Sequence, residues 1–393
     1  DMRIERSLII VALLIGAEAS AQVTLGNGDH VLEITGGVSM YYNQRFLKEG
    51  ETNKRKDRFN LRDAQLQFEG RYKNSFNYEL QFDMADLAQA SAGIIDPENP
   101  GLMDANVTYK GIPYLDITMG YGKLLYGRSN LVPFFQTPYW QRAELVRGDL
   151  FSRRDVGLTL STTFCKQRIS AYAGAYTGLG ETSLRGDNDP SGQLEYIGRI
   201  EAAWPSRFRK VDIDDRRVPV PMVAVGVNAR YTDKTQPPGA FLPSFSAGEY
   251  NIKVIDGKKT TVGGDIAAMY KGFSVQVEGH MIRLEPSAAN SALFQRLPRD
   301  QHEGYVMAGG YYAQANWWSK KLRTILSVRY EELNLNDLAT GLSQRLGGAI
   351  AYQVRGNDVM IKAQWWHILE EETTVDPLRW TEQARIGVQY LFR

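Results

Sequence analysis

Apolar and polar residues alternate with a period of two over long stretches of this chain. Between Asp63 and Tyr72 the even-numbered positions read Ala, Leu, Phe, Gly and Tyr, and the odd-numbered positions read Asp, Gln, Gln, Glu and Arg. Phe76 to Asp83 repeats this pattern after a Lys-Asn-Ser turn. A helix would spread these apolar residues round its whole surface, so the pattern predicts two strands joined by a tight turn.

The length of these strands separates two kinds of β protein. Each predicted strand has about ten residues, which crosses an outer membrane when the strand is tilted. Strands of soluble sandwiches have about five or six residues. The same alternation recurs over 115–121, 156–160, 223–231, 273–281, 322–330, 346–354 and 384–392.

Charged residues fall in the middle of several of these strands, among them Asp83, Arg230, Glu278 and Arg329. A lipid-facing surface or a dry core would hold them only at a high cost in free energy, whereas a water-filled lumen accommodates them. Aromatic residues gather near strand ends, as at Trp317-Trp318, which is typical of interfacial girdles. The sequence therefore predicts an all-β fold, a transmembrane antiparallel β-barrel.

The connections alternate between short and long. Short turns are expected at 73–75, 111–114, 165–167, 271–272, 319–321 and 355–358, and long polar loops at 43–58, 179–193, 233–259, 285–303 and 370–381. Short periplasmic turns and long external loops give this rhythm in outer-membrane barrels. Counting the pairs predicts about 16 strands, enough for an aqueous channel. No linker divides residues 22–393, so we expect a single barrel domain.

One segment departs from the alternation. Leu124 to Asp149 is too long for a simple turn and is rich in Phe, Tyr, Trp and Leu. Loops of this length are usually functional or disordered, and an apolar one needs a surface to pack against. We interpret it as an inward-folded constriction loop with a short helix near Gln141–Val146. An external lid or a trimer-contact loop is the alternative.

Composition and the N-terminal segment change this picture little. The 46 Lys and Arg residues nearly balance the 45 Asp and Glu residues, which argues against nucleic acid as a partner. The single cysteine, Cys165, excludes an internal disulfide framework and a Cys-rich metal site, and no cofactor is indicated.

Residues 1–21 combine Arg3 and Arg6, a short apolar run and Ala19-Ser20-Ala21, which predicts a signal peptide cleaved before Gln22. A short amphipathic helix of the folded domain is the alternative.

An enzyme is not indicated by any catalytic motif. No Gly-x-Ser-x-Gly or His-Glu-x-x-His sequence occurs. His280 and Glu278 fall on one strand face and could form an acid–base pair, and the remaining histidines are His30, His302 and His367. We expect a protein that is not an enzyme.

Three segments resemble phosphate-selective porins of the O/P type. They are the run from Glu144 to Leu160, the strand pair formed by Asp63–Tyr72 and Phe76–Asp86, and Gly120–Lys123, where the chain leaves a strand for the long loop. The final strand, ending in Phe392-Arg393, also resembles the signal read by barrel-insertion machinery. The resemblance implies a 16-stranded barrel in the outer membrane of a Gram-negative bacterium, usually a homotrimer, that passes small anions.

Pore-lining cations are a further implication of this resemblance. The candidates in this sequence are Lys123, Arg128, Arg142, Arg147, Arg153 and Arg154. Arginine presents a planar fork that suits phosphate oxygens, and a ring of cations favours anions. The alternative is that Arg153 and Arg154 pair with neighbouring aspartates or bind lipopolysaccharide at the rim.

Two functions stay open at this point. The first is a porin for passive diffusion of small solutes, anions such as phosphate among them, with outer-membrane lipid and lipopolysaccharide around it. The second is a barrel subunit of a multi-protein secretion or uptake complex, with other outer-membrane proteins as partners and no channel of its own.

Overall fold

The structure, a computed structural model, describes residues 23–50, 57–85, 101–148, 150–181, 189–242, 252–372 and 380–392. The expected signal peptide lies outside these residues. No helix in the described part of the chain is long and apolar enough to cross a membrane.

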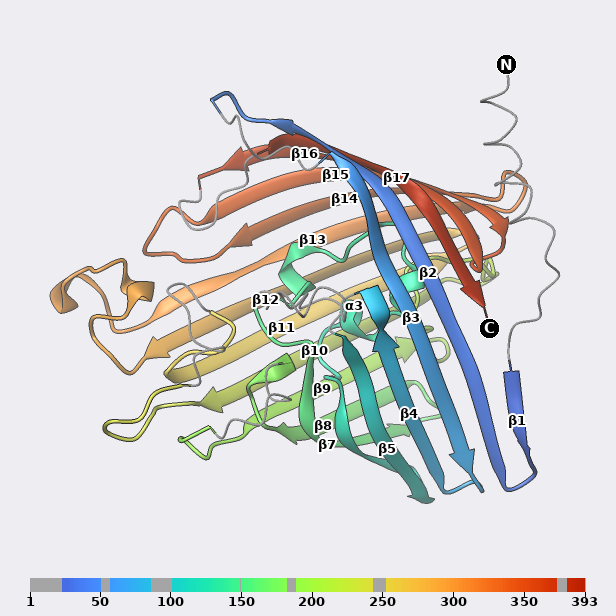
Figure 1. Cartoon of the computed structure of the whole chain (residues 1–393), viewed down its shortest axis with the longest axis horizontal. Helices are drawn as coiled ribbons and strands as arrows, with labels where there is room; N and C mark the ends of the chain where they lie inside the picture. Colours follow the sequence, from blue (N-terminus) through green and yellow to red (C-terminus); the bar gives the residue numbers. More distant parts are fainter. Residues whose placement is uncertain are drawn as a thin grey trace.

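The described chain forms one 17-stranded antiparallel sheet (Figure 1). Neighbouring strands pair in chain order from β2 to β17, and β17 pairs with β2, so these strands close into a 16-stranded barrel. The strands are β1 (Val23–Asn27), β2 (His30–Leu47), β3 (Arg58–Tyr72), β4 (Phe76–Asp83), β5 (Leu102–Ile112), β6 (Leu115–Lys123), β7 (Arg154–Phe164), β8 (Ile169–Tyr176), β9 (Glu195–Trp204), β10 (Met222–Asp233), β11 (Gly257–Tyr270), β12 (Phe273–Pro286), β13 (Val306–Ser319), β14 (Thr324–Asn334), β15 (Leu342–Arg355), β16 (Val359–Glu371) and β17 (Trp380–Phe392). The predicted fold class and strand number are confirmed.

The alternation in the sequence determines which side chains face the lumen. In β12, Val277 is 46% exposed on the outer surface, whereas its neighbour Glu278 is 1% exposed on the inner one. Successive side chains of a strand point to opposite faces of the sheet, so each strand supplies an apolar outer face for lipid and a polar inner face. Arg230 and Arg329 are buried in the same way, and so is Asp83, which ends β4 and does not lie in the middle of a strand as expected.

Strand β1 completes the edge of β2 beyond the end of β17. Residues Val23–Asn27 pair with residues 30–34 of β2, and Phe392 of β17 pairs with Gly36. A Cβ at Gly36 would lie 2.4 Å from the ring of Phe392, so glycine permits the close approach of that ring. Otherwise the first residues of β2 would present unpaired backbone groups on this edge.

Several predicted boundaries were wrong. Strand β2 continues to Leu47, so the loop expected from Asn43 is shorter than predicted. Strand β3 has 15 residues, because it begins at Arg58 and not at Asp63. In place of the helix expected near Gln141–Val146 there is a three-residue 3₁₀ turn, Glu144–Val146, and a separate short helix, α3, covers Arg128–Leu131. The Pro in this segment and its many side chain–backbone hydrogen bonds favour turns over a continuous helix.

Candidate functional site in the barrel lumen

The β6–β7 connection lies against the inner wall of the barrel. The backbone N–H of Trp140 donates to Gln364 Oε1 of β16 at 2.8 Å, and Lys362 Nζ of β16 donates to the carbonyl oxygen of Thr137 at 2.8 Å. Gln389 of β17 donates to the carbonyl oxygen of Phe135 at 3.0 Å. These strand residues belong to the polar inner face, so the described part of the connection is folded inward.

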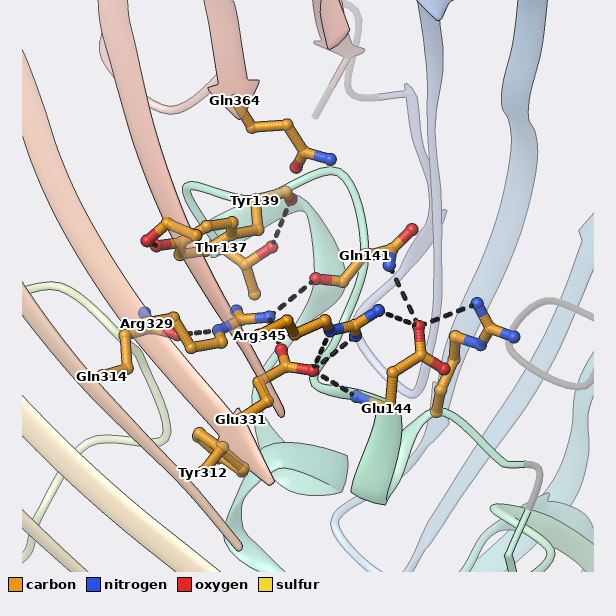
Figure 2. Close-up of polar contacts among 12 residues, drawn as sticks. Thr137, Tyr139, Gln141, Glu144, Tyr312, Gln314, Arg329, Glu331, Arg345 and Gln364 are labelled. Carbon is orange, nitrogen blue, oxygen red and sulfur yellow. Dashed lines mark hydrogen bonds and ion pairs between the residues drawn. The ribbon is translucent and has the colours of Figure 1, made fainter. Parts of the chain in front are cut away.

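Figure 2 shows how the middle of this connection is fixed to β14 and β15. Arg345 Nη1 of β15 pairs with Glu144 Oε1 at 2.8 Å, and its Nε donates to Glu331 Oε2 of β14 at 2.8 Å. The backbone N–H of Glu144 donates to Glu331 as well, at 3.1 Å. Arg329 of β14 stacks on the Tyr139 ring at 3.9 Å and donates to a backbone carbonyl of the connection. Two carboxylates and two guanidinium groups thus hold the loop by charge-assisted hydrogen bonds.

The protonation of Glu144 follows from this network. Burial acts to raise the pKa of the carboxyl group, but the charges of Arg147 and Arg345 outweigh it and lower the pKa to about 2. Glu144 is therefore an anion at neutral pH, and the loop depends on that charge.

The beginning of the connection is fixed to β12. Glu278 accepts a hydrogen bond from the backbone N–H of Ser129 at 2.8 Å and lies 2.8 Å from His280 Nε2. The hydroxyl of Tyr126, at the start of the connection, lies 3.0 Å from His280 Nδ1. The Glu278–His280 pair that could have suggested an acid–base dyad thus binds the loop with both of its side chains.

A dry apolar core fills the lumen beside β8–β14. Its members come from the β6–β7 connection, the external loops and inward positions of the strands. They include Leu124, Tyr126, Leu145, Val146, Leu150, Phe151, Ile252, Ile255, Ile282, Leu284, Leu293, Phe294 and Tyr312. No water-filled passage can run through this packed region.

Open space lies on the other side, against β2–β7. One cavity of about 470 Å³ is lined by residues of β2–β7 close to the short turns, including Glu33, Glu69, Glu79 and Asp116. A second cavity, of about 720 Å³, adjoins it and reaches the underside of the β6–β7 connection. The two share Glu33, Glu69 and Glu79 in their walls, so they are parts of one hollow.

Four of the six predicted cations line the larger cavity: Lys123, Arg142, Arg153 and Arg154. The three arginines also have structural partners. Arg154 pairs with Asp104 of β5 at 3.3 Å, and not with Asp155. Arg153 Nε donates to Asn130 Oδ1 at 2.9 Å, and Arg142 Nη2 donates to the carbonyl oxygen of Val132 at 2.8 Å.

The other two candidates lie elsewhere. Arg128 is fully buried in α3, where its guanidinium group faces the β9–β10 connection. Arg147 pairs with Glu144 at 3.3 Å and keeps about a third of its side chain exposed. The alternation carried no signal for either position, because both fall in the irregular loop.

Sequence reasoning identified only one member of a group of arginines at the long-loop end of the barrel. Arg147 belongs to it, together with cations of β2, β3 and β17 that lie close enough to repel one another. We call Arg45, Arg58, Arg62, Arg147 and Arg385 the arginine cluster. Except for Arg147, its members are strand residues near the long loops, so inward charges at strand ends were the signal that could have found them.

A closed barrel of 16 strands with an inward loop and a charged hollow has the architecture of outer-membrane porins. Solved structures with the same fold are the outer-membrane channel DcaP of Acinetobacter baumannii and OmpT of Vibrio cholerae. DcaP has a TM-score of 0.54 at 11% identity, over 95% of this chain and 100% of that one. OmpT has a TM-score of 0.56 at 10% identity, over 94% of this chain and 100% of that one. No curated protein matches the chain in sequence.

The family described as phosphate-selective porin O and P matches residues 33–210. This match confirms, over these residues, the resemblance inferred from the sequence. The protein is an outer-membrane barrel of the porin type.

Proposed function

We propose that the protein is a porin that lets small anions diffuse across the outer membrane through the hollow beside β2–β7. This proposal rests on the cavity of about 720 Å³. Its wall at the β6–β7 connection holds Lys123, Arg142, Arg153 and Arg154. Four cations on one side of a cavity favour anions over cations electrostatically.

The arginine cluster supports the same preference. It lies at the end with the long loops, which faces the outside in such barrels. Anions arriving from outside would meet Arg45, Arg62 and Arg147 before they reach the cavity, and a concentration of one charge raises the local concentration of its counter-ions.

Acidic residues in the wall of the hollow oppose this preference for anions. The smaller cavity near the short turns is lined by Glu33, Glu69, Glu79 and Asp116, together with Arg71 and Lys110, and the three glutamates also line the larger cavity. Anion preference thus depends on the part beneath the β6–β7 connection controlling the flux, and the family description as phosphate-selective supports that assignment for residues 33–210.

We also propose that the barrel assembles as a homotrimer. OmpT of Vibrio cholerae, which shares the fold, has been solved in a trimer form with a TM-score of 0.55 at 10% identity, over 93% of this chain and 100% of that one. Crosslinking of the protein in outer-membrane vesicles would give a trimer band, and only monomer bands would contradict this assignment.

Single-channel recording in a planar bilayer tests the function. With a salt gradient, the wild-type reversal potential should show anion preference, and phosphate should reduce the chloride current. The variants Arg45→Gln and Arg147→Gln should shift the reversal potential toward cations. The matched control, Arg283→Gln, removes an exposed charge that pairs with Glu285 away from the hollow, and it should cause no shift.

Each other outcome points to a different conclusion. Steps without ion preference would keep the porin function and remove the anion selectivity. A folded barrel without conductance would instead favour the second function, a subunit of a multi-protein outer-membrane complex.

A further inference from the structure

The β9–β10 connection, Pro205–Pro221, is far longer than the other described connections at its end of the barrel. That end otherwise carries tight turns, such as Lys271–Gly272 between β11 and β12. The middle of this connection is buried: Phe208, Val211, Asp212, Ile213 and Asp214 are each at most 8% exposed. A turn projecting into the periplasm would leave such residues in water, so this one packs against the protein.

The surface that it packs against is the inner wall of the barrel. The carbonyl oxygen of Asp212 accepts hydrogen bonds from Ser274 Oγ of β12 at 2.6 Å and from Asn316 Nδ2 of β13 at 2.9 Å. Both donors belong to the buried polar face of their strands. Ile213 packs with inward residues of the next three strands, which are Ile325, Ala351 and Met360. The connection therefore enters the lumen from the short-turn end and covers the wall from β12 to β16.

Further polar contacts hold the connection in this position. The carboxylate of Asp214 accepts hydrogen bonds from the backbone N–H groups of Val218, at 3.0 Å, and Gly272, at 2.8 Å. Lys210 forms an ion pair with Glu201 of β9. A segment with satisfied buried polar groups and a packed apolar side is a fixed part of the lumen.

Arg128 joins this connection to the β6–β7 loop. Its Nη2 donates to the carbonyl oxygens of Arg209 and Val211, both at 3.1 Å, and its guanidinium carbon lies 4.5 Å from the centre of the Phe208 ring. Arg128 is fully buried. The two inward segments, which enter from opposite ends, thus meet at one arginine.

The hollow is lined in part by the β6–β7 loop but avoids the β9–β10 connection. No residue of the β9–β10 connection lines either described cavity, and neither does any residue of β8–β16. We propose that the β9–β10 connection is a second constriction, which enters the pore from the periplasmic end, and that Arg128 is its positioning residue. Together with the β6–β7 loop it confines the solute path to the side of β2–β7. This inference rests on the proposed channel function for its effect on solutes, but its geometry can be tested without conductance.

Cysteine accessibility tests the geometry first, in a Cys165→Ser background because Cys165 is exposed. Ser274→Cys lies beneath the connection, whereas Thr118→Cys lines the smaller cavity. A bulky maleimide added from the periplasmic side should label Thr118→Cys and leave Ser274→Cys unlabelled. Replacing residues 207–217 by Gly-Asn should make Ser274→Cys reactive while Thr118→Cys stays reactive. Equal labelling of both sites in the full-length protein would overturn the proposal.

Conductance tests the consequence for the pore. Shortening the connection should raise single-channel conductance by on the order of twofold, because space on the β12–β16 side becomes available to ions. Arg128→Ala should raise it in the full-length protein and add nothing in the shortened one. Arg128→Lys, which keeps a donor for the two carbonyl oxygens, should restore conductance close to wild type. Arg216→Ala is the matched control, since Arg216 is an exposed arginine of the same connection.

The outcomes separate this inference from the proposed function. Unchanged conductance in the shortened protein, with a wild-type channel that conducts, would overturn the second constriction and keep the porin. A wild-type barrel that does not conduct would overturn the channel, while the labelling of Ser274→Cys would still decide where the connection lies. Additive effects of Arg128→Ala and the shortened connection would overturn the positioning role of Arg128.

Discussion

The two sides of the lumen are built from the same alternating strands and yet differ completely in what they enclose. On the filled side, inward polar groups bind loop backbone as well as one another, as Gln364 does with Trp140. On the open side they are paired with one another across the wall, as Gln67 Nε2 is with Glu79 Oε1 at 2.9 Å. Alternation therefore determines that a side chain points inward, and the connections determine whether it meets protein or solvent.

This difference has an energetic consequence. A polar group that is covered by protein costs free energy unless it is hydrogen-bonded. Each hydrogen bond between loop and wall on the filled side therefore contributes more to stability than a similar bond on the open side. Substitutions on the filled side should reduce stability, and substitutions on the open side should change selectivity.

The largest effect is expected from Arg345→Met on the filled side. The change leaves Glu331 and Glu144 without their shared guanidinium partner (Figure 2). Removing one partner of a buried ion pair costs about 3–5 kcal/mol. Unfolding of the refolded barrel in urea should show this loss. Arg283→Met removes one member of an exposed pair with Glu285 and should cost at most about 1 kcal/mol. Equal losses for the two variants would contradict the comparison.

A smaller loss is expected from Lys259→Met. Lys259 Nζ donates to the carbonyl oxygens of Leu150 at 2.6 Å, Ile252 at 2.5 Å and Lys253 at 3.0 Å, and so joins two connections to β11. Leaving buried acceptors unsatisfied costs about 1–3 kcal/mol. The same urea experiment measures it, with Lys258→Met as the control, because Lys258 is the exposed neighbour on the outer face. A loss no larger than that of the control would show that water replaces the ammonium group.

The barrel itself could be predicted from the sequence because the pattern that predicts its strands is local. A period of two needs only neighbouring residues, so strand identity, inward charges such as Glu278 and the approximate strand number followed directly. Strand ends were less certain. Strand β2 continues through the polar residues Asn43, Gln44 and Arg45 to Leu47, and β3 begins at Arg58, because polar residues occur both near strand ends and in loops.

The filling of the lumen could not be predicted in the same way. The aromatic content of residues 124–149 predicted an inward loop, but the partners of its Arg128 come from a distant connection, where Arg209 and Val211 supply the carbonyl oxygens. The β9–β10 connection carried no comparable signal: its buried residues Phe208, Val211 and Ile213 are spaced irregularly among charges. Such contacts join residues that are far apart in the sequence, and a period of two does not encode them.

On the open side, Glu79→Gln should change selectivity while leaving stability nearly unchanged. Glu79 lines both cavities, so removing its charge should shift the reversal potential toward anions in a salt gradient. Glu285→Gln, on an exposed side chain that pairs with Arg283, should not shift it. A loss of stability without a change of reversal potential would mean that this wall is also part of a packed region.

The effect confined to the narrowest range of conditions is expected from pH, and it concerns Glu144 on the filled side. Its pKa in the folded protein is about 2, below the ordinary value of 4.5, because the charges of Arg147 and Arg345 outweigh the effect of burial. A carboxyl group with a lowered pKa contributes stability that is fully present above its unfolded pKa and is lost as pH falls through the folded pKa. The difference in unfolding free energy between wild type and Glu144→Gln should therefore be constant from pH 7 to about 5 and should shrink toward pH 2. A difference that stayed constant down to pH 2 would show that Glu144 acts through its hydrogen-bonding shape alone, and the filled side would then owe less to charge than its ion pairs indicate.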